Sequence, residues 1–267
     1  MGQPIGIMDS GVGGLTVVKE VMRQLPNEEV IYIGDTARCP YGPRPVDEVR
    51  AYTWQMTRFL LEKNVKMLVI ACNTATAVTL TEIRSALKIP VLGVIHPGAR
   101  SAIKHTRTGK IGVIGTEGTI KSEAYKKALK SINQLVDVQG LACPRFVPLV
   151  ESGEFRGPFA ERIVEQELAT FKNAYIDTLI LGCTHYPLLE ETISQYLGPE
   201  VQIISSGEET AREMSTILFF QDLLNSSSFE PNHQFFTTGS SKLFSQIASQ
   251  WLELDSIQTE SISLERY

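Results

Sequence analysis

Two cysteines, Cys72 and Cys183, stand in matching sequence contexts that suit proton transfer. Each ends a short apolar run and precedes polar residues that can cap a helix. A helix N-terminus favours negative charge and makes a thiolate more accessible. A thiolate on one face of a carbon and a thiol on the other can remove its proton and return one with inversion. The pair therefore indicates an inverting proton-transfer site, with two buried structural cysteines as the alternative. The polar residues that follow are Asn73, Thr74, Thr184 and His185.

A carboxylate and a glycine-rich turn follow the first apolar run. Asp9 and Ser10 precede the glycine-rich segment 11–14, where small residues let the backbone approach a ligand closely. Thr16 stands where a dinucleotide-binding loop requires its third glycine, and no Gly-Lys-Ser/Thr sequence follows as in a P-loop. We interpret Asp9 as a carboxylate that orients a ligand ammonium group or assists a thiol, with a simple helix cap as the alternative.

The segment 34–43 is rich in turn-forming residues and follows the second apolar run. It is a candidate wall of a ligand site or an ordinary connection. His185, two residues after Cys183, is an acid/base helper, the partner of a cysteine nucleophile or a packing residue. Of the other cysteines, Cys143 is predicted to be structural, and Cys39 has no visible partner in the sequence.

These residues depend on a regular alternation of strands and helices. Since ligands bind beyond the carboxyl ends of parallel strands, the residues singled out above are well placed. Val- and Ile-rich runs that are apolar throughout are typical of parallel strands buried on both faces. They predict strands at 5–8, 30–34, 67–71, 91–95, 111–114, 136–141, 178–182, 201–205 and 235–238. Amphipathic segments between them predict helices that include 14–25, 46–63, 74–87, 118–131, 159–173, 187–197, 208–224 and 241–251. The order favours an α/β fold with mostly parallel sheets.

A faint internal repeat suggests two α/β units of similar plan. Residues 5–11 resemble 111–117, and residues 68–74 resemble 179–185, at nearly one offset. Apolar strand starts also look alike by chance, so duplication is one of two explanations. We expect a first domain formed by 1–95 plus 207–267, and a second domain formed by 96–206. The first would carry Asp9 and Cys72, and the second Cys183 and His185.

Composition excludes several classes of protein. The 267 residues include 25 basic and 30 acidic side chains, a net charge of −5 that gives no general attraction to nucleic acid or anionic membranes. The longest wholly apolar stretch has six residues, whereas a membrane span needs about 18. The start of the chain lacks a charged signal-peptide region. The four cysteines are widely separated, which disfavours a disulfide scaffold and structural zinc. We expect a cytoplasmic protein with no nucleic-acid or membrane partner and no metal.

Four motifs together resemble glutamate racemases of the aspartate/glutamate racemase family, and the resemblance covers essentially the whole chain. The motifs are Gly6-Ile7-Met8-Asp9-Ser10-Gly11-Val12-Gly13-Gly14-Leu15-Thr16, Gly34-Asp35-Thr36-Ala37-Arg38-Cys39-Pro40-Tyr41-Gly42, Ala71-Cys72-Asn73-Thr74-Ala75 and Gly182-Cys183-Thr184-His185-Tyr186-Pro187. The resemblance implies two pseudo-symmetric α/β domains with the active site in the cleft between them. It implies cofactor-independent interconversion of L- and D-glutamate for peptidoglycan and cell-wall synthesis, and hence cell shape. It also implies a homodimer.

By the same resemblance, Cys72 acts on the D-substrate proton and Cys183 on the L-substrate proton. Asp9 and His185 assist them and also contact the substrate. The resemblance gives further substrate contacts at Ser10, Tyr41, Gly42, Asn73, Thr74 and Thr184. It suggests Asp35 and Glu151 as additional helpers.

Three other functions remain open from the sequence. A related racemase for aspartate or a hydantoin would share the two cysteines. A cysteine hydrolase would use Cys183 with His185 and would not need Cys72. A nonenzymatic amino-acid-binding module would bind glutamate without exchanging its α-hydrogen.

Overall fold

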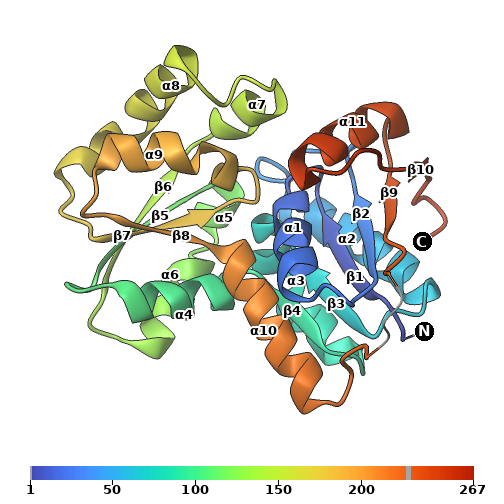
Figure 1. Ribbon diagram of the computed structural model, residues 1–267. Coiled ribbons are helices and arrows are strands. Elements are labelled where there is room, and N and C mark those ends of the chain that lie inside the picture. Colours follow the sequence, from blue (N-terminus) through green and yellow to red (C-terminus); the bar gives the residue numbers. More distant parts are fainter. Residues whose placement is uncertain (1, 227–229) are drawn as a thin grey trace. The chain divides into compact units, whose positions relative to one another are not determined.

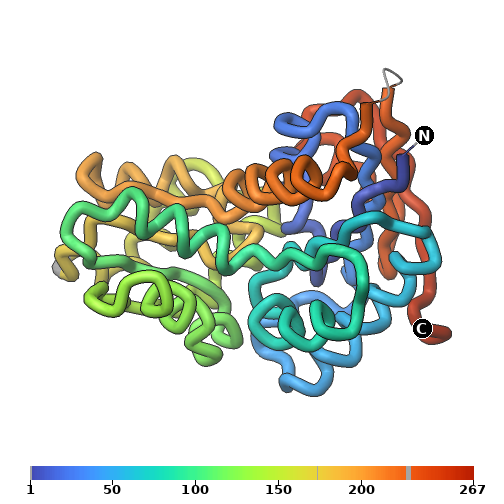
Figure 2. Tube along the Cα trace, turned by 90° about the horizontal axis from the view of Figure 1, so that it is seen from below, coloured from blue at the N-terminus to red at the C-terminus, as the bar shows by residue number. Residues whose placement is uncertain are grey.

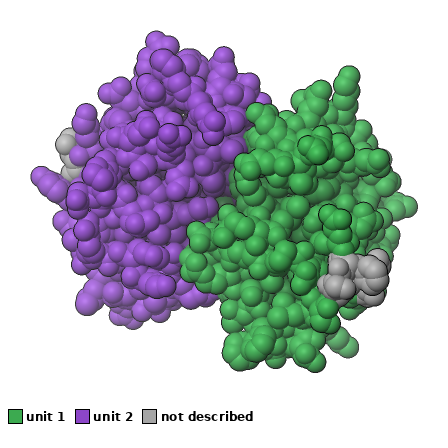
Figure 3. Space-filling model, viewed as in Figure 1, with its two compact units in different colours: residues 1–94, 207–267 green, residues 95–206 purple. Residues whose placement is uncertain are grey.

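The computed structural model describes residues 2–226 and 230–267. Contacts within the chain divide it into two compact units, Met1–Val94 with Gly207–Tyr267, and Ile95–Ser206 (Figure 3). Figure 2 traces the chain as it leaves the first unit after Val94 and returns to it at Gly207. Each unit contains a parallel β-sheet with helices around it (Figure 1). The predicted α/β class with mostly parallel sheets is confirmed.

The sheet of the first unit has the strand order β10-β9-β2-β1-β3-β4, and every neighbouring pair is parallel. Its three central strands are buried along their whole length, as expected for apolar runs covered on both faces. The strands are β1 (Ile5–Asp9), β2 (Val30–Gly34), β3 (Met67–Ile70), β4 (Val91–Gly93), β9 (Gln234–Thr237) and β10 (Thr259–Ser261).

The helices of the first unit bury apolar stripes against this sheet. In α1, for example, Leu15, Val18 and Val21 are buried at the spacing of one helical face. The helices are α1 (Leu15–Gln24), α2 (Val46–Glu62), α3 (Asn73–Ala86), α10 (Ser206–Phe220) and α11 (Ser241–Leu252). The first residue of α10, Ser206, belongs to the second unit.

The helix predicted at 208–224 ends earlier, at Phe220, for a local reason. Asp222 adopts a left-handed backbone conformation with φ 56°, and the N–H of Leu223 donates to the carbonyl of Leu218 at 2.8 Å. This pattern closes a helix C-terminus. Lys66 holds the chain just beyond this helix, because its Nζ lies 2.5 Å from the Leu223 carbonyl oxygen. The same Nζ lies 2.6 Å from Glu28 Oε2, and the side chains of Lys66 and Glu28 are both buried.

The second unit has a four-stranded parallel sheet in the order β6-β5-β7-β8. The strands are β5 (Lys110–Gly115), β6 (Asp137–Ala142), β7 (Thr178–Gly182) and β8 (Gln202–Ser205). The helical segments are α4 (Ile95–His105), α5 (Glu117–Lys121), α6 (Ala124–Ile132), α7 (Phe146–Glu151), α8 (Pro158–Leu168), η1 (Ala169–Asn173), η2 (Tyr186–Leu189) and α9 (Glu190–Leu197). The strand β7, which precedes Cys183, is central and fully buried.

Several predicted boundaries in this unit are wrong. The strand predicted at 91–95 ends at Gly93, and Ile95 begins α4, a helix concealed in the sequence by Pro97 and Gly98. The helix predicted at 118–131 is two helices, because Glu123 between them has a left-handed φ of 54°. The helix predicted at 187–197 begins as the 3₁₀ turn η2 and becomes α-helical at Glu190.

Asp177 anchors the turn that leads into β5. Its carboxylate accepts hydrogen bonds from Thr106 Oγ1 at 2.6 Å, Arg107 N at 2.7 Å, Thr108 N at 2.5 Å and Thr108 Oγ1 at 2.8 Å. Burial raises the pKa of Asp177, but the hydrogen bonds to its ionised form outweigh burial and hold the pKa at about 2. The charged carboxylate is therefore part of the folded unit at neutral pH.

We expect Asp177→Asn to lower the free energy of unfolding at pH 7 by about 1–2 kcal/mol, because the amide cannot accept all of these bonds. The folded-state pKa lies below the ordinary value of about 3.9, so the stabilisation is present above that pH and is lost as the pH falls towards 2. Urea unfolding at several pH values measures it. Asp137→Asn, at an exposed aspartate of the same unit, is the control. A stability loss no larger than that of the control would contradict the prediction.

Candidate active site

In the first unit, Asp9 ends β1 at the carboxyl edge of the sheet. It is fully buried, and its Oδ2 accepts a hydrogen bond from Gly11 N at 3.0 Å. A methyl group added at Gly14 would lie 2.6 Å from Asp9 Cβ and 2.8 Å from Tyr32 Oη, so this turn requires glycine. Tyr32 Oη in turn donates to the Gly11 carbonyl at 2.7 Å. The glycine-rich turn thus holds the Asp9 carboxylate in place.

Cys72 lies at the same edge, beyond β3, which pairs with β1. The N–H of Ala71 donates to the Met8 carbonyl at 2.9 Å, which keeps Cys72 beside the end of β1. Cys72 is itself the N-cap of α3, and its Sγ accepts from Ala75 N at 3.4 Å. The expectation that the following residues cap the helix is wrong, because Asn73 already lies in the first helical turn. The sulfur therefore faces the N–H groups of a helix start, where negative charge is favoured. Ser10, Asn73 and Thr74 are buried at this edge.

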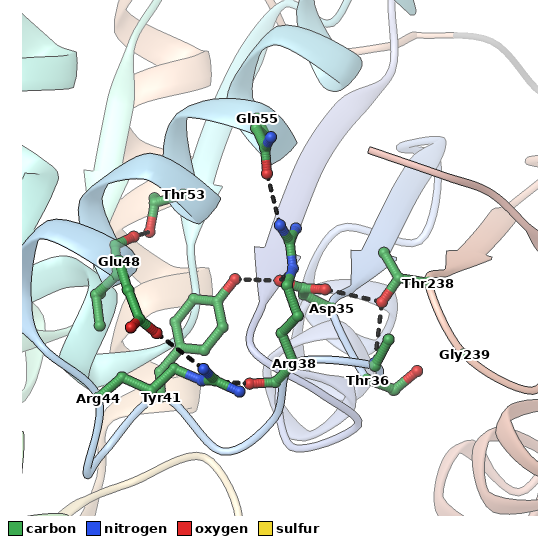
Figure 4. A network of polar contacts seen from close by, with 12 residues as sticks. Asp35, Thr36, Arg38, Tyr41, Arg44, Glu48, Thr53, Gln55, Thr238 and Gly239 are labelled. Atoms are coloured by element: carbon green, nitrogen blue, oxygen red, sulfur yellow. Dashed lines mark hydrogen bonds and ion pairs between the residues drawn. The ribbon is translucent and has the colours of Figure 1, made fainter. Parts of the chain in front are cut away.

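The loop after β2 is organised around the buried carboxylate of Asp35 (Figure 4). Asp35 Oδ2 accepts from Tyr41 Oη at 2.5 Å and from Arg38 Nε at 2.7 Å, and Oδ1 accepts from Thr238 Oγ1 at 2.8 Å. Burial, followed by the negative charge of Asp35, raises the pKa of Tyr41. Tyr41 therefore keeps its proton and serves Asp35 as a donor. Gly42, next along the loop, is buried.

Further contacts of this loop fix it to α2 and to the end of β9 (Figure 4). Arg38 Nη1 donates to Gln55 Oε1 at 2.6 Å, and the guanidinium lies 3.9 Å from the ring centroid of Tyr52. Thr36 Oγ1 and Thr237 Oγ1 are 2.6 Å apart. Sequence reasoning missed the roles of Arg38, Gln55 and Thr238. Arg38 lies within the motif at 34–42, whereas nothing in the sequence marks Gln55 or Thr238.

In the second unit, a chain of three polar side chains begins at Cys183, just beyond β7. His185 Nδ1 lies 3.8 Å from Cys183 Sγ, and His185 Nε2 lies 3.1 Å from Glu151 Oε1. Cys183 and His185 are buried, whereas the side chain of Glu151, at the end of α7, is 37% exposed. The structure thus brings Glu151 to His185 from 34 residues away. This arrangement resembles a nucleophile–histidine–carboxylate chain in its order of contacts.

Electrostatics favour the charged form of His185. Burial lowers the pKa of His185, but hydrogen bonds to Cys183 and Glu151, together with their negative charges, outweigh burial and raise it to about 10. These contacts favour the imidazolium form of His185, in which one ring nitrogen faces the sulfur and the other faces the carboxylate.

The backbone at Cys183 differs from that at Cys72. Cys183 begins a turn in which Tyr186 N donates to its carbonyl at 3.1 Å, and the first helical segment, η2, follows three residues later. Cys183 is thus not a helix N-cap. Of the residues expected to cap a helix here, His185 takes the N-cap position of η2 but makes no side-chain capping hydrogen bond. Tyr186 Oη donates to the Cys143 carbonyl at 2.9 Å and fixes the turn. Thr184 is buried within it.

The two remaining cysteines, Cys39 and Cys143, are not joined in disulfide bonds. Cys143 is fully buried, and burial raises its pKa well above the ordinary range, which agrees with the structural role expected from the sequence. Cys39 is half-buried in the loop after β2.

Across residues 2–226 and 230–267, no three or more histidine, cysteine, aspartate or glutamate side chains are grouped so that they could hold a metal ion. None of the helices described is long and apolar enough to cross a membrane.

Comparison with known proteins gives one consistent result. The family model for Asp/Glu/Hydantoin racemase matches residues 5–214. A glutamate racemase from Carnobacterium sp. (strain St2) is 59% identical over 264 residues, or 98% of each chain. The crystal structure of glutamate racemase isoform RacE1 from Bacillus anthracis has a TM-score of 0.95 at 52% identity and covers 98% of each chain. That of glutamate racemase from Francisella tularensis, in complex with D-glutamate, has a TM-score of 0.92 at 35% identity and covers 100% of this chain and 99% of that one.

Proposed function

This chain belongs to the Asp/Glu/Hydantoin racemase family, and we propose that it interconverts L- and D-glutamate without a cofactor, by means of Cys72 and Cys183. It is an isomerase of the glutamate racemase type. One observation carries the proposal. The chain matches glutamate racemases over nearly its full length, and in each of its two sheets a buried strand is followed by a cysteine at the carboxyl edge.

In the proposed reaction, the two thiols act on opposite faces of the same substrate carbon. In the L-to-D direction, the thiolate of Cys183 removes the α-proton, and the electron pair of the C–H bond moves towards the α-carboxylate. The thiol of Cys72 then gives its proton to the other face of the carbon. The product is D-glutamate, with Cys183 protonated and Cys72 ionised, which is the state that runs the reverse reaction. Proton transfer by positioned groups of this kind contributes about 10²–10⁴-fold to a rate.

The residues of the first unit have distinct proposed roles around Cys72. The α-carboxylate must be stabilised as charge builds on it, and the N–H groups at the start of α3 are donors of the required kind. Asp9, buried at the same edge, faces the substrate ammonium group or receives the Cys72 proton. Ser10, Asn73 and Thr74 are proposed substrate contacts.

In the second unit, His185 and Glu151 are proposed to serve Cys183. A protonated His185 supplies an N–H group to the sulfur when Cys183 has given up its proton, at the observed separation of 3.8 Å. Glu151 keeps the imidazole oriented through its contact with Nε2. Thr184, in the same turn, is a proposed substrate contact. A simple cysteine hydrolase would leave Cys72 without a role.

The substrate is best tested with a panel of amino acids. Circular dichroism follows the loss of optical activity when L-glutamate, D-glutamate, either enantiomer of aspartate or a 5-substituted hydantoin is mixed with the protein. We expect racemisation of both glutamate enantiomers and at most weak activity on the others. Faster racemisation of aspartate or a hydantoin would assign the chain to another branch of the family. Binding of glutamate without any change in optical activity would indicate the binding-module alternative.

Tyr41→Phe should impair substrate binding more than proton transfer. Tyr41 and Gly42 are proposed substrate contacts, and the Tyr41 hydroxyl is one of the donors that hold Asp35. Losing it leaves a buried carboxylate short of a donor, so the loop after β2 should lose its fixed position. We expect KM for glutamate to rise about tenfold, with a smaller change in kcat. Tyr52→Phe, which retains a ring beside Arg38, is the matched control. An unchanged KM in Tyr41→Phe would contradict this role for the loop.

The cellular role and the assembly state belong to the proposal as well. We propose that the chain acts in the cytoplasm, supplies D-glutamate for peptidoglycan and forms a homodimer. The similarity to glutamate racemases supports the first two statements, and the family resemblance of the sequence supports the third. Depletion in the parent cell should produce a requirement for D-glutamate. Sedimentation equilibrium should give twice the chain mass of 29.6 kDa.

A further inference from the structure

The chain passes between the two units twice. In the second unit, residues beside these two chain crossings both contact one buried tyrosine. The chain passes between the units after Val94 and after Ser206. The hydroxyl of Tyr125, in α6, is hydrogen-bonded to the side chain of Ser206. A methyl group built at Gly98, in the first turns of α4, would lie 3.5 Å from Tyr125 Oη and 3.2 Å from Ser206 Cβ. Tyr125 thus contacts the segment that enters the unit and the residue that leaves it.

The same ring also contacts the residue that precedes Cys183. A methyl group built at Gly182, the last residue of β7, would lie 3.0 Å from Tyr125 Cε2 and 2.6 Å from the Ile114 carbonyl oxygen. Only glycine fits there without a shift of the backbone. The ring of Tyr125 therefore packs directly on the peptide that carries Cys183.

The physical environment makes this connection stiff. Tyr125 and Ser206 are 3% and 4% exposed, and close-packed interiors transmit small displacements with little loss. Burial raises the pKa of Tyr125, so its hydroxyl remains neutral and hydrogen-bonded. One buried ring therefore contacts Ser206, the backbone near Gly98 and the backbone at Gly182.

We propose that Tyr125 is a positioning residue for Cys183, which couples the two chain crossings to the turn that holds the sulfur. This role rests on the proposed function. The hydroxyl of Tyr125 keeps the ring seated between Ser206 and Gly182, and the seated ring fixes the Gly182–Cys183 peptide. Proton transfer at Cys183 thereby depends on Tyr125, a side chain outside the proposed substrate contacts. Proton transfer at Cys72 does not depend on Tyr125.

The test compares Tyr125→Phe, Ser206→Ala and the double variant with Tyr196→Phe, which removes the hydroxyl of a half-buried tyrosine elsewhere in the unit. We expect each single variant to lose about three- to tenfold in kcat, as for one lost hydrogen bond, and the double variant to lose no more than either. Tyr196→Phe should match the wild type. L- and D-glutamate have equal free energies, so kcat/KM must fall equally in both directions.

Isotope effects identify which thiol is impaired. With α-deuterated L-glutamate, from which Cys183 removes the deuteron, the isotope effect should rise, because that step limits the rate more. With α-deuterated D-glutamate, from which Cys72 removes it, the isotope effect should fall. Wild-type rates in both single variants would overturn the proposal. Slower rates with unchanged isotope effects would also overturn it, because a general packing defect gives that result. A wild-type protein that exchanges no α-proton at all would contradict the proposed function itself.

Discussion

Replacing either active-site thiol, as Cys72→Ser or Cys183→Ser, is expected to reduce glutamate racemisation about 10³-fold or more. Serine keeps the size and geometry of the side chain, but its hydroxyl does not ionise near neutral pH as a thiol can. Each thiol is needed in every turnover, because one of the two acts as the base and the other acts as the acid. The loss should therefore be similar for both variants and in both directions.

The single variants should differ in residual proton exchange. Cys72→Ser retains the thiol that acts on L-glutamate, so it should exchange the α-proton of L-glutamate with solvent faster than that of D-glutamate. Cys183→Ser should show the opposite preference. Cys143→Ala is the control, because this buried thiol lies outside the proposed mechanism. Racemisation is measured by circular dichroism, and a serine variant that keeps more than a tenth of the wild-type kcat would exclude its cysteine as an acid/base group.

Replacing His185 is expected to have the second largest effect, a loss of about 10²-fold in kcat for His185→Asn. Asparagine keeps a donor near Cys183 but cannot carry the positive charge that lies 3.8 Å from the sulfur. Glu151→Gln should cost less, about tenfold, because it weakens only the contact that orients the imidazole. The double variant should lose little more than His185→Asn alone, since the two residues act through one chain of contacts. Fully additive losses would show that Glu151 acts independently of His185.

The His185→Asn variant should also change how the free energy of unfolding depends on pH. The folded-state pKa of His185, about 10, lies above the ordinary histidine value of about 6.5. The resulting stabilisation is fully present below the ordinary value, declines above it, and is lost as the pH rises through the folded-state value. The difference in unfolding free energy between wild type and His185→Asn should shrink accordingly between those two pH values. His105→Asn, at an exposed histidine of the second unit, is the control. A difference that grows with pH would contradict the assignment of a charged imidazole.

Much of the fold could be predicted because buried parallel strands leave a strong mark. The runs at 30–34 and 178–182 are strands with those bounds, β2 and β7. The helix ends that could not be predicted depend on the backbone conformation of single residues. Glu123 and Asp222 adopt left-handed conformations that end helices without a glycine to signal them. The short strand β10 is polar and partly exposed, so it has no apolar pattern.

The contacts of the site were less predictable than its residues. The spacing of Cys183 and His185 is local, so their proximity follows from the sequence. The contact of His185 with Glu151 requires α7, a six-residue helix that sequence periodicity did not predict. Thr238 reaches Asp35 because β9 pairs with β2, although about 200 residues separate the two strands. Such contacts are set by tertiary packing and have no sequence pattern of their own.

In the proposed reaction, this chain removes and returns the α-proton of glutamate with its own residues. Proton NMR of L-glutamate, and separately of D-glutamate, in D₂O with purified protein, a chelator and no added cofactor tests it most directly. We expect the α-proton signal to disappear from either enantiomer while the opposite enantiomer accumulates. Persistence of the α-proton signal in both enantiomers, with folded protein, would contradict it.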